Sequence, residues 1–141
     1  MTTSPVAWEN LVEGQGPEPW TVGPITLTDV VRYQGASGDF NPIHHDVDFA
    51  QVSGFTRPLV VGMYQAGVLN TYAADWLGPE NVRRTKVRWK TPLFPGDLIT
   101  CSGKVARKYE EQGERRVDVD LVCINQTGAV AVEGAMTFVV P

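Results

Sequence analysis

Cysteine is scarce in this chain of 141 residues, in which Cys101 and Cys123 are the only two. Two cysteines are too few for the disulfide framework of a small secreted domain, so we expect a protein of the reducing cytoplasm. The first nine residues, MTTSPVAWE, lack the basic stretch and apolar run of a signal peptide, which agrees with that location. No histidine lies beside either cysteine in the sequence, and we predict structural roles for both.

A surplus of positive charge is also missing. The chain has 12 Lys and Arg residues against 16 Asp and Glu residues, and its net charge is −4. This balance excludes a general nucleic-acid binder, which needs basic residues to displace counterions. The longest uncharged run, residues 58–74, contains polar residues and is shorter than the roughly 20 apolar residues of a membrane helix. We therefore predict neither a nucleic-acid partner nor a membrane partner.

No repeat, low-complexity tract or linker divides the chain, and we predict a single domain over residues 1–141. The first half has helix signals. Thr28 is a candidate N-cap for a helix that ends between residues 35 and 38, and Asp46 or Asp48 is a candidate cap for a short helix ending near residue 53. A long apolar helix is predicted from Gly62 to Leu77, because glycine and proline follow it.

The second half has the patterns of β-strands. Residues 84–91 and 116–121 alternate polar with apolar side chains, and residues 98–109 and 129–140 are rich in β-formers. Turn residues separate these runs, and residues 14–24 are predicted to form a loop or an edge segment. The long helix is apolar on almost every side and needs cover. We predict an α+β fold in which about four antiparallel strands curve around it.

The densest group of polar residues follows the first helix. Asp39 and His44 lie five residues apart across a loop that contains Pro42. A carboxylate and an imidazole that converge on one water molecule can remove a proton from it and return a proton elsewhere. The spacing alone fits equally well a turn-forming aspartate and a histidine buried in the core.

The segment around this pair resembles the signature of the MaoC-like, (R)-specific enoyl-CoA hydratases. The matching residues are Tyr33, the small residues after it, the string Ser37-Gly38-Asp39-Phe40-Asn41-Pro42-Ile43-His44, and Ala50. The similarity continues through residues 57–63 (RPLVVGM) and, more loosely, residues 94–97 (FPGD), so it covers most of the chain. The family fold is the hot-dog, a single domain in which an antiparallel sheet wraps around a long central helix.

The resemblance implies roles for the residues of these motifs. Asp39 and His44 would hold the water that adds to a trans-2-enoyl thioester, giving an (R)-3-hydroxyacyl thioester. The backbone N–H of Gly62 would stabilise the enolate oxygen, because it would lie at the N-terminus of the central helix. Substrate-binding residues would be Tyr33, Asn41, Val61 and Met63. This chain departs from the family at Val61, where many members have histidine, and at Asn70, where some short-chain relatives have a small hydroxyl residue.

The implied substrate is an acyl thioester of coenzyme A or of acyl carrier protein, and the resemblance implies no cofactor. Lys86, Arg88 and Lys90 are predicted to share one strand face, opposite Val87 and Trp89. This stripe is either a solvated face or a binding site for the phosphates of the carrier. The family pattern further implies a homodimer, or a heterodimer with a second hot-dog subunit.

Other functions stay open at this point. A hot-dog acyl-CoA thioesterase would hydrolyse the thioester, and a subunit of a heteromeric hydratase could be non-catalytic. Residues 44–48 and 72–79 are similar to the small subunits of hydratases that act on sterol side-chain acyl-CoA esters, so both fatty acid and sterol side-chain metabolism are possible. No metal is predicted, because His44, His45, Asp46 and Asp48 do not form a familiar ligand set.

Overall fold

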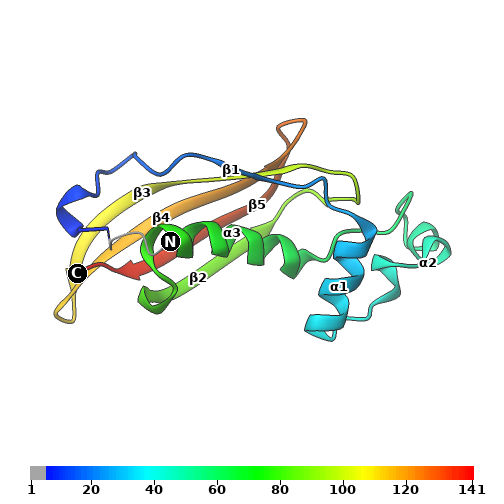
Figure 1. Ribbon diagram of the computed structural model, residues 1–141, viewed down its shortest axis with the longest axis horizontal. Helices are drawn as coiled ribbons and strands as arrows, with labels where there is room; N and C mark the ends of the chain where they lie inside the picture. Colours follow the sequence, from blue (N-terminus) through cyan, green and yellow to red (C-terminus); the bar gives the residue numbers. More distant parts are fainter. Residues whose placement is uncertain (1–5) are drawn as a thin grey trace.

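The computed structural model describes residues 6–141, which form one sheet and a few helices (Figure 1). Five antiparallel strands lie in the order β1-β3-β4-β5-β2. Their bounds are β1 (Trp20–Val22), β2 (Val82–Trp89), β3 (Ile99–Glu111), β4 (Glu114–Asn125) and β5 (Val130–Val139). The helices are α1 (Leu27–Ser37), α2 (Val47–Val52) and α3 (Gly62–Leu77), together with three short 3₁₀ turns, η1 (Trp8–Asn10), η2 (Pro42–His44) and η3 (Pro79–Asn81).

Helix α3 packs against one face of the sheet, and the long strands curve past it (Figure 1). Leu69 and Tyr72 of α3 are buried against apolar side chains of β4 and β5. Glycines in the strands allow the helix to approach this closely. A Cβ added at Gly134 would lie 3.1 Å from Leu69 Cδ2, and one at Gly103 would lie 3.3 Å from Tyr72 Cε1. This arrangement confirms the predicted α+β hot-dog fold.

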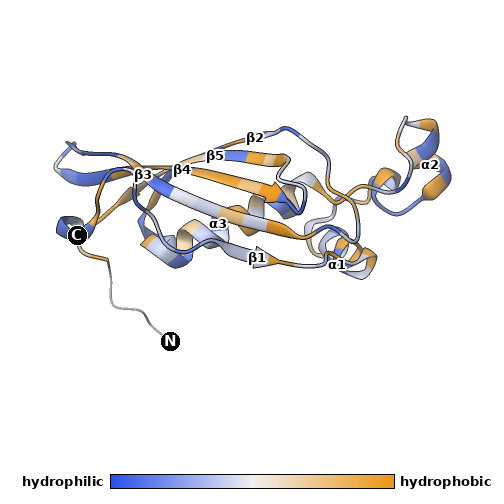
Figure 2. Ribbon diagram, turned by 90° about the horizontal axis from the view of Figure 1, so that it is seen from above, coloured by the Kyte–Doolittle hydropathy of each residue, from blue (hydrophilic) through white to orange (hydrophobic). Residues whose placement is uncertain are grey.

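Helices α1 and α2 lie beyond one end of the sheet, as the two perpendicular views show (Figures 1 and 2). The loop between them and the start of α3 are therefore at the same end of the molecule. The predicted bounds of the long helix are confirmed, since α3 runs from Gly62 to Leu77 and Gly78 ends it. Asp46 is the cap of α2, because its Oδ1 accepts a hydrogen bond from the Phe49 N–H at 3.0 Å.

One of the sequence predictions about elements was wrong. Thr26 caps α1, not Thr28, and it forms a capping box with Asp29 in which each side chain accepts from the other's backbone N–H. The sheet has five strands where about four were expected, because residues 20–22, within the segment predicted as a loop or an edge segment, pair with residues 99–101 at the sheet edge. This three-residue strand at the sheet edge has too few residues to display an alternating pattern.

Candidate active site

The loop of residues 38–46 (the Asp39 loop) connects α1 to α2. It begins at Gly38, which ends α1 in the left-handed conformation with φ 77°. Asp39 then folds back on the chain, since its Oδ1 accepts a hydrogen bond from the Asn41 N–H at 3.2 Å. Asn41 in turn caps η2 through its Oδ1, which accepts from the Ile43 N–H at 3.1 Å. These bonds leave Asp39 Oδ2 available for other contacts.

His44 is held by residues 58–61, the segment that leads into α3. Its Nδ1 lies 2.9 Å from the carbonyl oxygen of Leu59. Because a carbonyl oxygen can only accept, Nδ1 carries the hydrogen of the neutral ring, and Nε2 is left with its lone pair. The side chain is 11% exposed, so only a small part of the ring reaches solvent. His44 is thus oriented as a proton acceptor at Nε2.

The structure brings His44 and Asp39 together. His44 Nε2 lies 3.9 Å from Asp39 Oδ2, and the Asp39 side chain is 45% exposed. This separation is too long for a direct hydrogen bond, but one water oxygen can lie within hydrogen-bonding distance of both atoms. The arrangement can hold a water between an acceptor nitrogen and a carboxylate oxygen, which is the geometry needed for proton removal.

Gly62 is the first residue of α3, and its N–H is among the helix N–H groups that have no acceptor within the helix. Two contacts fix the segment before it: Leu59 N–H donates to Ile43 O at 3.1 Å, and Val60 N–H donates to Leu93 O at 2.8 Å. The same Leu59 carbonyl holds His44, so the histidine and the helix start are joined through one short segment. The helix terminus favours an anion at this point.

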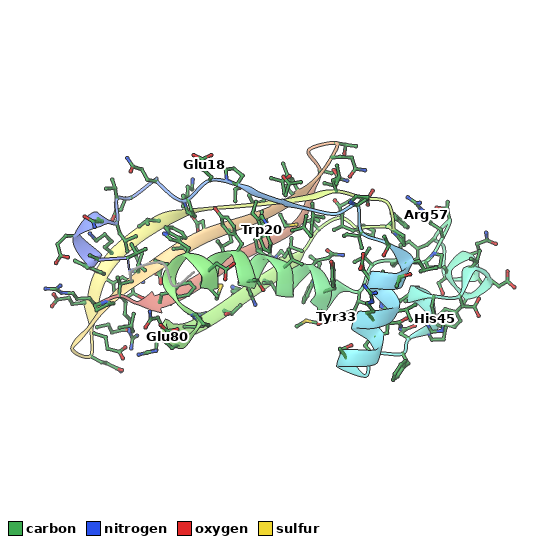
Figure 3. All side chains as sticks on the ribbon, in the orientation of Figure 1. Glu18, Trp20, Tyr33, His45, Arg57 and Glu80 are labelled. Atoms are coloured by element: carbon green, nitrogen blue, oxygen red, sulfur yellow. The ribbon has the colours of Figure 1, made fainter. Side chains whose placement is uncertain are left out.

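The other predicted substrate-binding residues differ in their surroundings. Tyr33 packs edge-to-face on Tyr64, with ring centroids 5.6 Å apart, and both Tyr33 and His45 lie at the helical end of the molecule (Figure 3). Burial raises the pKa of Tyr64, with a smaller contribution from the charge of Asp29, so its phenol stays protonated at neutral pH. Met63 is 55% exposed, whereas Val61 is buried in the hydrophobic core. Asn41 is exposed, and its side-chain oxygen is already occupied at η2.

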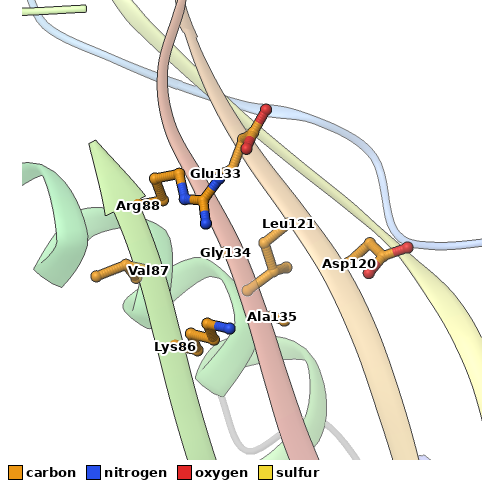
Figure 4. Close-up of a pocket in the computed structure, with 8 residues that line it drawn as sticks. All are labelled: Lys86, Val87, Arg88, Asp120, Leu121, Glu133, Gly134 and Ala135. Carbon is orange, nitrogen blue, oxygen red and sulfur yellow. The ribbon is translucent and has the colours of Figure 1, made fainter. Parts of the chain in front are cut away.

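The predicted basic stripe of Lys86, Arg88 and Lys90 lies apart from Asp39 and His44. The Trp89 indole N–H donates to Gly62 O at 2.8 Å, so Trp89 faces α3, and its neighbours Arg88 and Lys90 face away from the helix. Lys86 and Arg88 line an open depression of about 380 Å³, together with the carboxylates of Asp120 and Glu133 (Figure 4). The structure does not bring the stripe together with Asp39 and His44 within one chain.

Residues that sequence reasoning missed also contact the site. Gln34 was not singled out, yet it is buried and bonds to the Asp39 loop. The sequence does contain a signal for Gln34, since it lies four residues after Val30 and therefore on the same face of the helix. A polar side chain on the buried face of a helix needs hydrogen-bond partners. The bond from Trp89 to the Gly62 carbonyl oxygen was not predicted from the sequence either.

Residues 6–141 contain neither a cluster of metal-binding side chains nor a membrane-spanning helix. In that range no three His, Cys, Asp or Glu side chains gather in a position to hold a metal ion. Over the same residues, no helix has the length and apolar character needed to cross a membrane. The prediction about a signal peptide depends partly on residues 1–5, which lie outside the described residues.

Comparison with known proteins decides the family. The model of the MaoC like domain matches residues 11–127. The chain belongs to the MaoC-like domain family. This confirms the resemblance carried by residues 33–50 and makes the protein a member of a family that contains hydratases.

Three relatives illustrate this membership. The chain is 30% identical over 115 residues to the (R)-specific enoyl-CoA hydratase of Aeromonas caviae, which covers 80% of this chain and 84% of that protein. It is 32% identical over 79 residues to the 3-oxo-4,17-pregnadiene-20-carboxyl-CoA hydratase beta subunit of Mycobacterium tuberculosis, over 55% of this chain and 61% of that one. The solved (R)-hydratase from A. caviae involved in PHA biosynthesis superposes with a TM-score of 0.78 at 26% identity, over 94% and 99% of the chains. Some curated relatives are far longer: the match spans 14% of the mouse peroxisomal multifunctional enzyme type 2 and as little as 5% of another relative.

Proposed function

We propose that the protein is an (R)-specific enoyl-CoA hydratase, which reversibly adds water to a trans-2-enoyl thioester. The observation that supports this most directly is the 3.9 Å gap between His44 Nε2 and Asp39 Oδ2, at the same end of the molecule as the free N–H of Gly62. Water addition to an enoyl thioester needs a base for the water and a donor for the thioester oxygen. Both requirements are met by groups of the MaoC-like motif.

In the proposed reaction, the water molecule donates one hydrogen bond to His44 Nε2 and another to Asp39 Oδ2. His44 Nε2 removes one proton from it, and the other hydrogen stays on the oxygen as the hydroxyl of the product. Its oxygen bonds to C3 of the substrate, the π electrons move toward the thioester, and negative charge develops on the thioester oxygen. The Gly62 N–H donates to that oxygen, with help from the α3 dipole. The proton taken from the water returns to C2 through the same pair of side chains. Dehydration follows these steps in reverse.

The (R) configuration of the product is proposed from the relatives and from the Asp39–His44 motif. The acyl group is that of a fatty acid or of a sterol side chain, and the latter is supported by the likeness to the M. tuberculosis beta subunit. The carrier is coenzyme A or acyl carrier protein. Two buried, unbridged thiols, Cys101 and Cys123, support a reducing compartment such as the cytoplasm.

We further propose that the protein acts as a homodimer or as a heterodimer with a second hot-dog subunit. Among the described residues, β2 pairs with β5 alone, and its other edge has no neighbouring strand. Large apolar side chains near this edge and on the helical end are exposed, among them Phe40, Val47, Met63 and Trp89. Light scattering of the purified protein should give twice the mass of one chain. A monomer that gains activity with a second chain would favour the heteromeric form.

The test of the function is an assay of the purified protein on a series of trans-2-enoyl-CoA esters. We expect loss of the conjugated absorbance without release of free thiol, and chiral analysis should find the (3R)-hydroxyacyl product. Release of free thiol at an equal rate would instead identify a thioesterase. An inactive protein with an intact fold would favour a non-catalytic subunit.

A further inference from the structure

Gln34 is a buried polar side chain beside the Asp39 loop, and no step of the proposed reaction uses it. Its side chain projects from α1, and the residue is 2% exposed. Its Nε2 donates to the carbonyl oxygens of Asp39, at 2.9 Å, and Asn41, at 3.2 Å. Its Oε1 lies 3.0 Å from His45 Nδ1. We propose that Gln34 is a positioning residue that sets the backbone of the Asp39 loop and thereby the gap between Asp39 and His44.

The partners of Gln34 fix the orientation of both side chains in this cluster. Two carbonyl oxygens can only accept, so they face the amide nitrogen of Gln34. The amide oxygen therefore faces His45, and His45 Nδ1 must carry the ring hydrogen. Gln34 uses two donors and one acceptor at once. No other residue type of similar size offers this combination of donors and acceptor.

The carbonyls that Gln34 holds are placed where they control the reacting groups. One belongs to Asp39 itself, and the other belongs to Asn41, whose N–H bonds Asp39 Oδ1 at 3.2 Å. The Asn41 carbonyl also accepts from the His44 N–H at 3.1 Å. A rotation of these peptides would change the direction of the Asp39 carboxylate relative to His44. Displacing a reacting group by roughly 1 Å can cost about 100-fold in rate.

A purely structural role makes a different prediction. If Gln34 only satisfies buried backbone groups, its loss lowers the melting temperature but leaves the turnover of each folded molecule unchanged. If it positions the loop, turnover falls in molecules that remain folded. Because Gln34 does not touch the substrate, KM should stay within about threefold of the wild-type value while kcat falls.

Two substitutions separate these roles when the enzyme is assayed on its best enoyl-CoA ester. Gln34→Glu keeps the shape, removes both donors and places a carboxylate against two carbonyl oxygens. Gln34→Leu removes all three bonds. We expect kcat to fall by about 10- to 100-fold in both, within the range for misplaced reacting groups. The control is Gln51→Glu, which adds the same charge on α2 at an exposed residue with no side-chain hydrogen bond among the described residues.

The pH dependence adds a readout that a loss of stability would not produce. At lower pH the new carboxyl of the Gln34→Glu variant gains a proton and can donate one hydrogen bond again. The ratio of its kcat to that of the wild type should therefore rise as the pH falls. The same ratio for Gln34→Leu should stay flat. A flat ratio for both variants, or full kcat in folded samples of both, overturns the proposal.

A spectroscopic test does not depend on activity. The chain has two histidines, so protein labelled with ¹⁵N-histidine gives two ring spin systems, which a His44→Gln variant assigns. We expect the neutral rings of both to carry hydrogen on Nδ1. Gln34→Leu should change the His45 tautomer and shift the His44 signals. A wild-type His45 ring with its hydrogen on Nε2 overturns the proposal without any variant.

The catalytic part of this inference rests on the proposed function, and the two can fail separately. A wild-type protein that hydrates no enoyl-CoA ester refutes the proposed function, while the histidine spectra still decide whether Gln34 orders the loop. An active wild type whose Gln34 variants keep full kcat refutes the positioning role alone.

Discussion

The indole Nε1–H of Trp89 donates a hydrogen bond to the carbonyl oxygen of Gly62 at 2.8 Å, and it joins the edge strand β2 to the first turn of α3. The ring lies so close that a Cβ added at Gly62 would be 3.0 Å from Trp89 Nε1. A side chain at this position would therefore press on the tryptophan ring, which would have to shift by a few tenths of an ångström. The start of α3 is fixed from the sheet by Trp89 and from the Asp39 loop through Leu59 and His44.

Replacing Trp89 with phenylalanine tests the contribution of this bond. The ring is largely kept, but the donor to Gly62 O is lost, and the first turn of α3 becomes less well fixed. We expect kcat/KM for hydration to fall about 2- to 10-fold, which corresponds to one net hydrogen bond. Trp20→Phe is the control, because Trp20 is exposed on β1 and makes no side-chain hydrogen bond among residues 6–141. Equal activities of the two variants would show that the bond is irrelevant to catalysis.

Substitution of Gly62 tests the oxyanion donor. A side chain at this position would press on Trp89 and, in the proposed reaction, would occupy the space where the thioester oxygen approaches the N–H. We expect Gly62→Val to lose about 100-fold or more in turnover, the size of the loss when an oxyanion donor is removed. Substrate binding should weaken less, since the contact strengthens as charge develops.

The matched control for Gly62 is Gly67→Ala in the same helix. A Cβ at Gly67 meets no atom within 4 Å, so alanine should leave activity unchanged and stabilise the helix by up to about 1 kcal/mol. Melting temperatures of all variants separate folding from chemistry. Combining Gly62→Ala with Trp89→Leu should recover part of the stability lost by Gly62→Ala alone. A folded Gly62→Val protein with full activity would place the donor elsewhere.

Asp39→Asn and His44→Gln test the proposed pair directly. Each should fold, because Asp39 is 45% exposed and the glutamine amide nitrogen can still donate to the Leu59 carbonyl. Turnover should fall by about 10²- to 10⁴-fold, the range for general acid–base catalysis. Asp48→Asn, at an exposed residue in the first turn of α2, is the control for loss of one carboxylate. Near-wild-type hydration by either site variant would contradict the proposal that Asp39 and His44 are the catalytic pair.

Local signals explain which parts of the fold could be predicted. The bounds of α3 follow from an apolar run that is ended by Gly78 and Pro79, all of which lie within one segment. The cap of α1 was misplaced by two residues because two threonines, Thr26 and Thr28, lie close to the helix start, and only the reciprocal bonds with Asp29 identify Thr26 as the cap. For residues 14–24 a loop and an edge segment were both left open, because the three residues of β1 depend on pairing with residues 99–101, far along the chain.

The candidate site divides in the same way. Asp39 and His44 are visible in the sequence because they belong to one short motif. The role of Gln34 is not visible there, because it depends on how the loop turns back over α1. The alternation in β2 predicts that Lys86 and Arg88 lie opposite Trp89, and the bond to Gly62 O places Trp89 on the side of the strand that meets α3. Which of these faces meets α3 depends on the curvature of the whole sheet, and a strand pattern does not contain that information.

The basic stripe on β2 supplies a last prediction, which concerns the carrier and not the chemistry. Lys90 is engaged with Glu133, at 3.3 Å between Nζ and Oε2, whereas Lys86 and Arg88 form no ion pair among the described residues. If carrier phosphates reach over the β2 edge, these two side chains are the ones free to meet them. The variant that carries Lys86→Glu and Arg88→Glu should therefore raise KM for the CoA ester at least about threefold while kcat changes little.

Salt and position provide the controls for that variant. The rise in KM should shrink as salt is added, because exposed charges are screened beyond about 10 Å at 0.1 M ionic strength. Lys104→Glu reverses an exposed charge on β3, three strands away in the sheet, and should leave KM unchanged. The wild type and the double variant should also be compared on thioesters with and without the carrier's nucleotide phosphates. Their KM values should differ for the esters that carry the phosphates and agree for those that lack them. An unchanged KM at low salt would mean that the stripe is a solvated face, in which Asp120 and Glu133 already balance the positive charge of the depression.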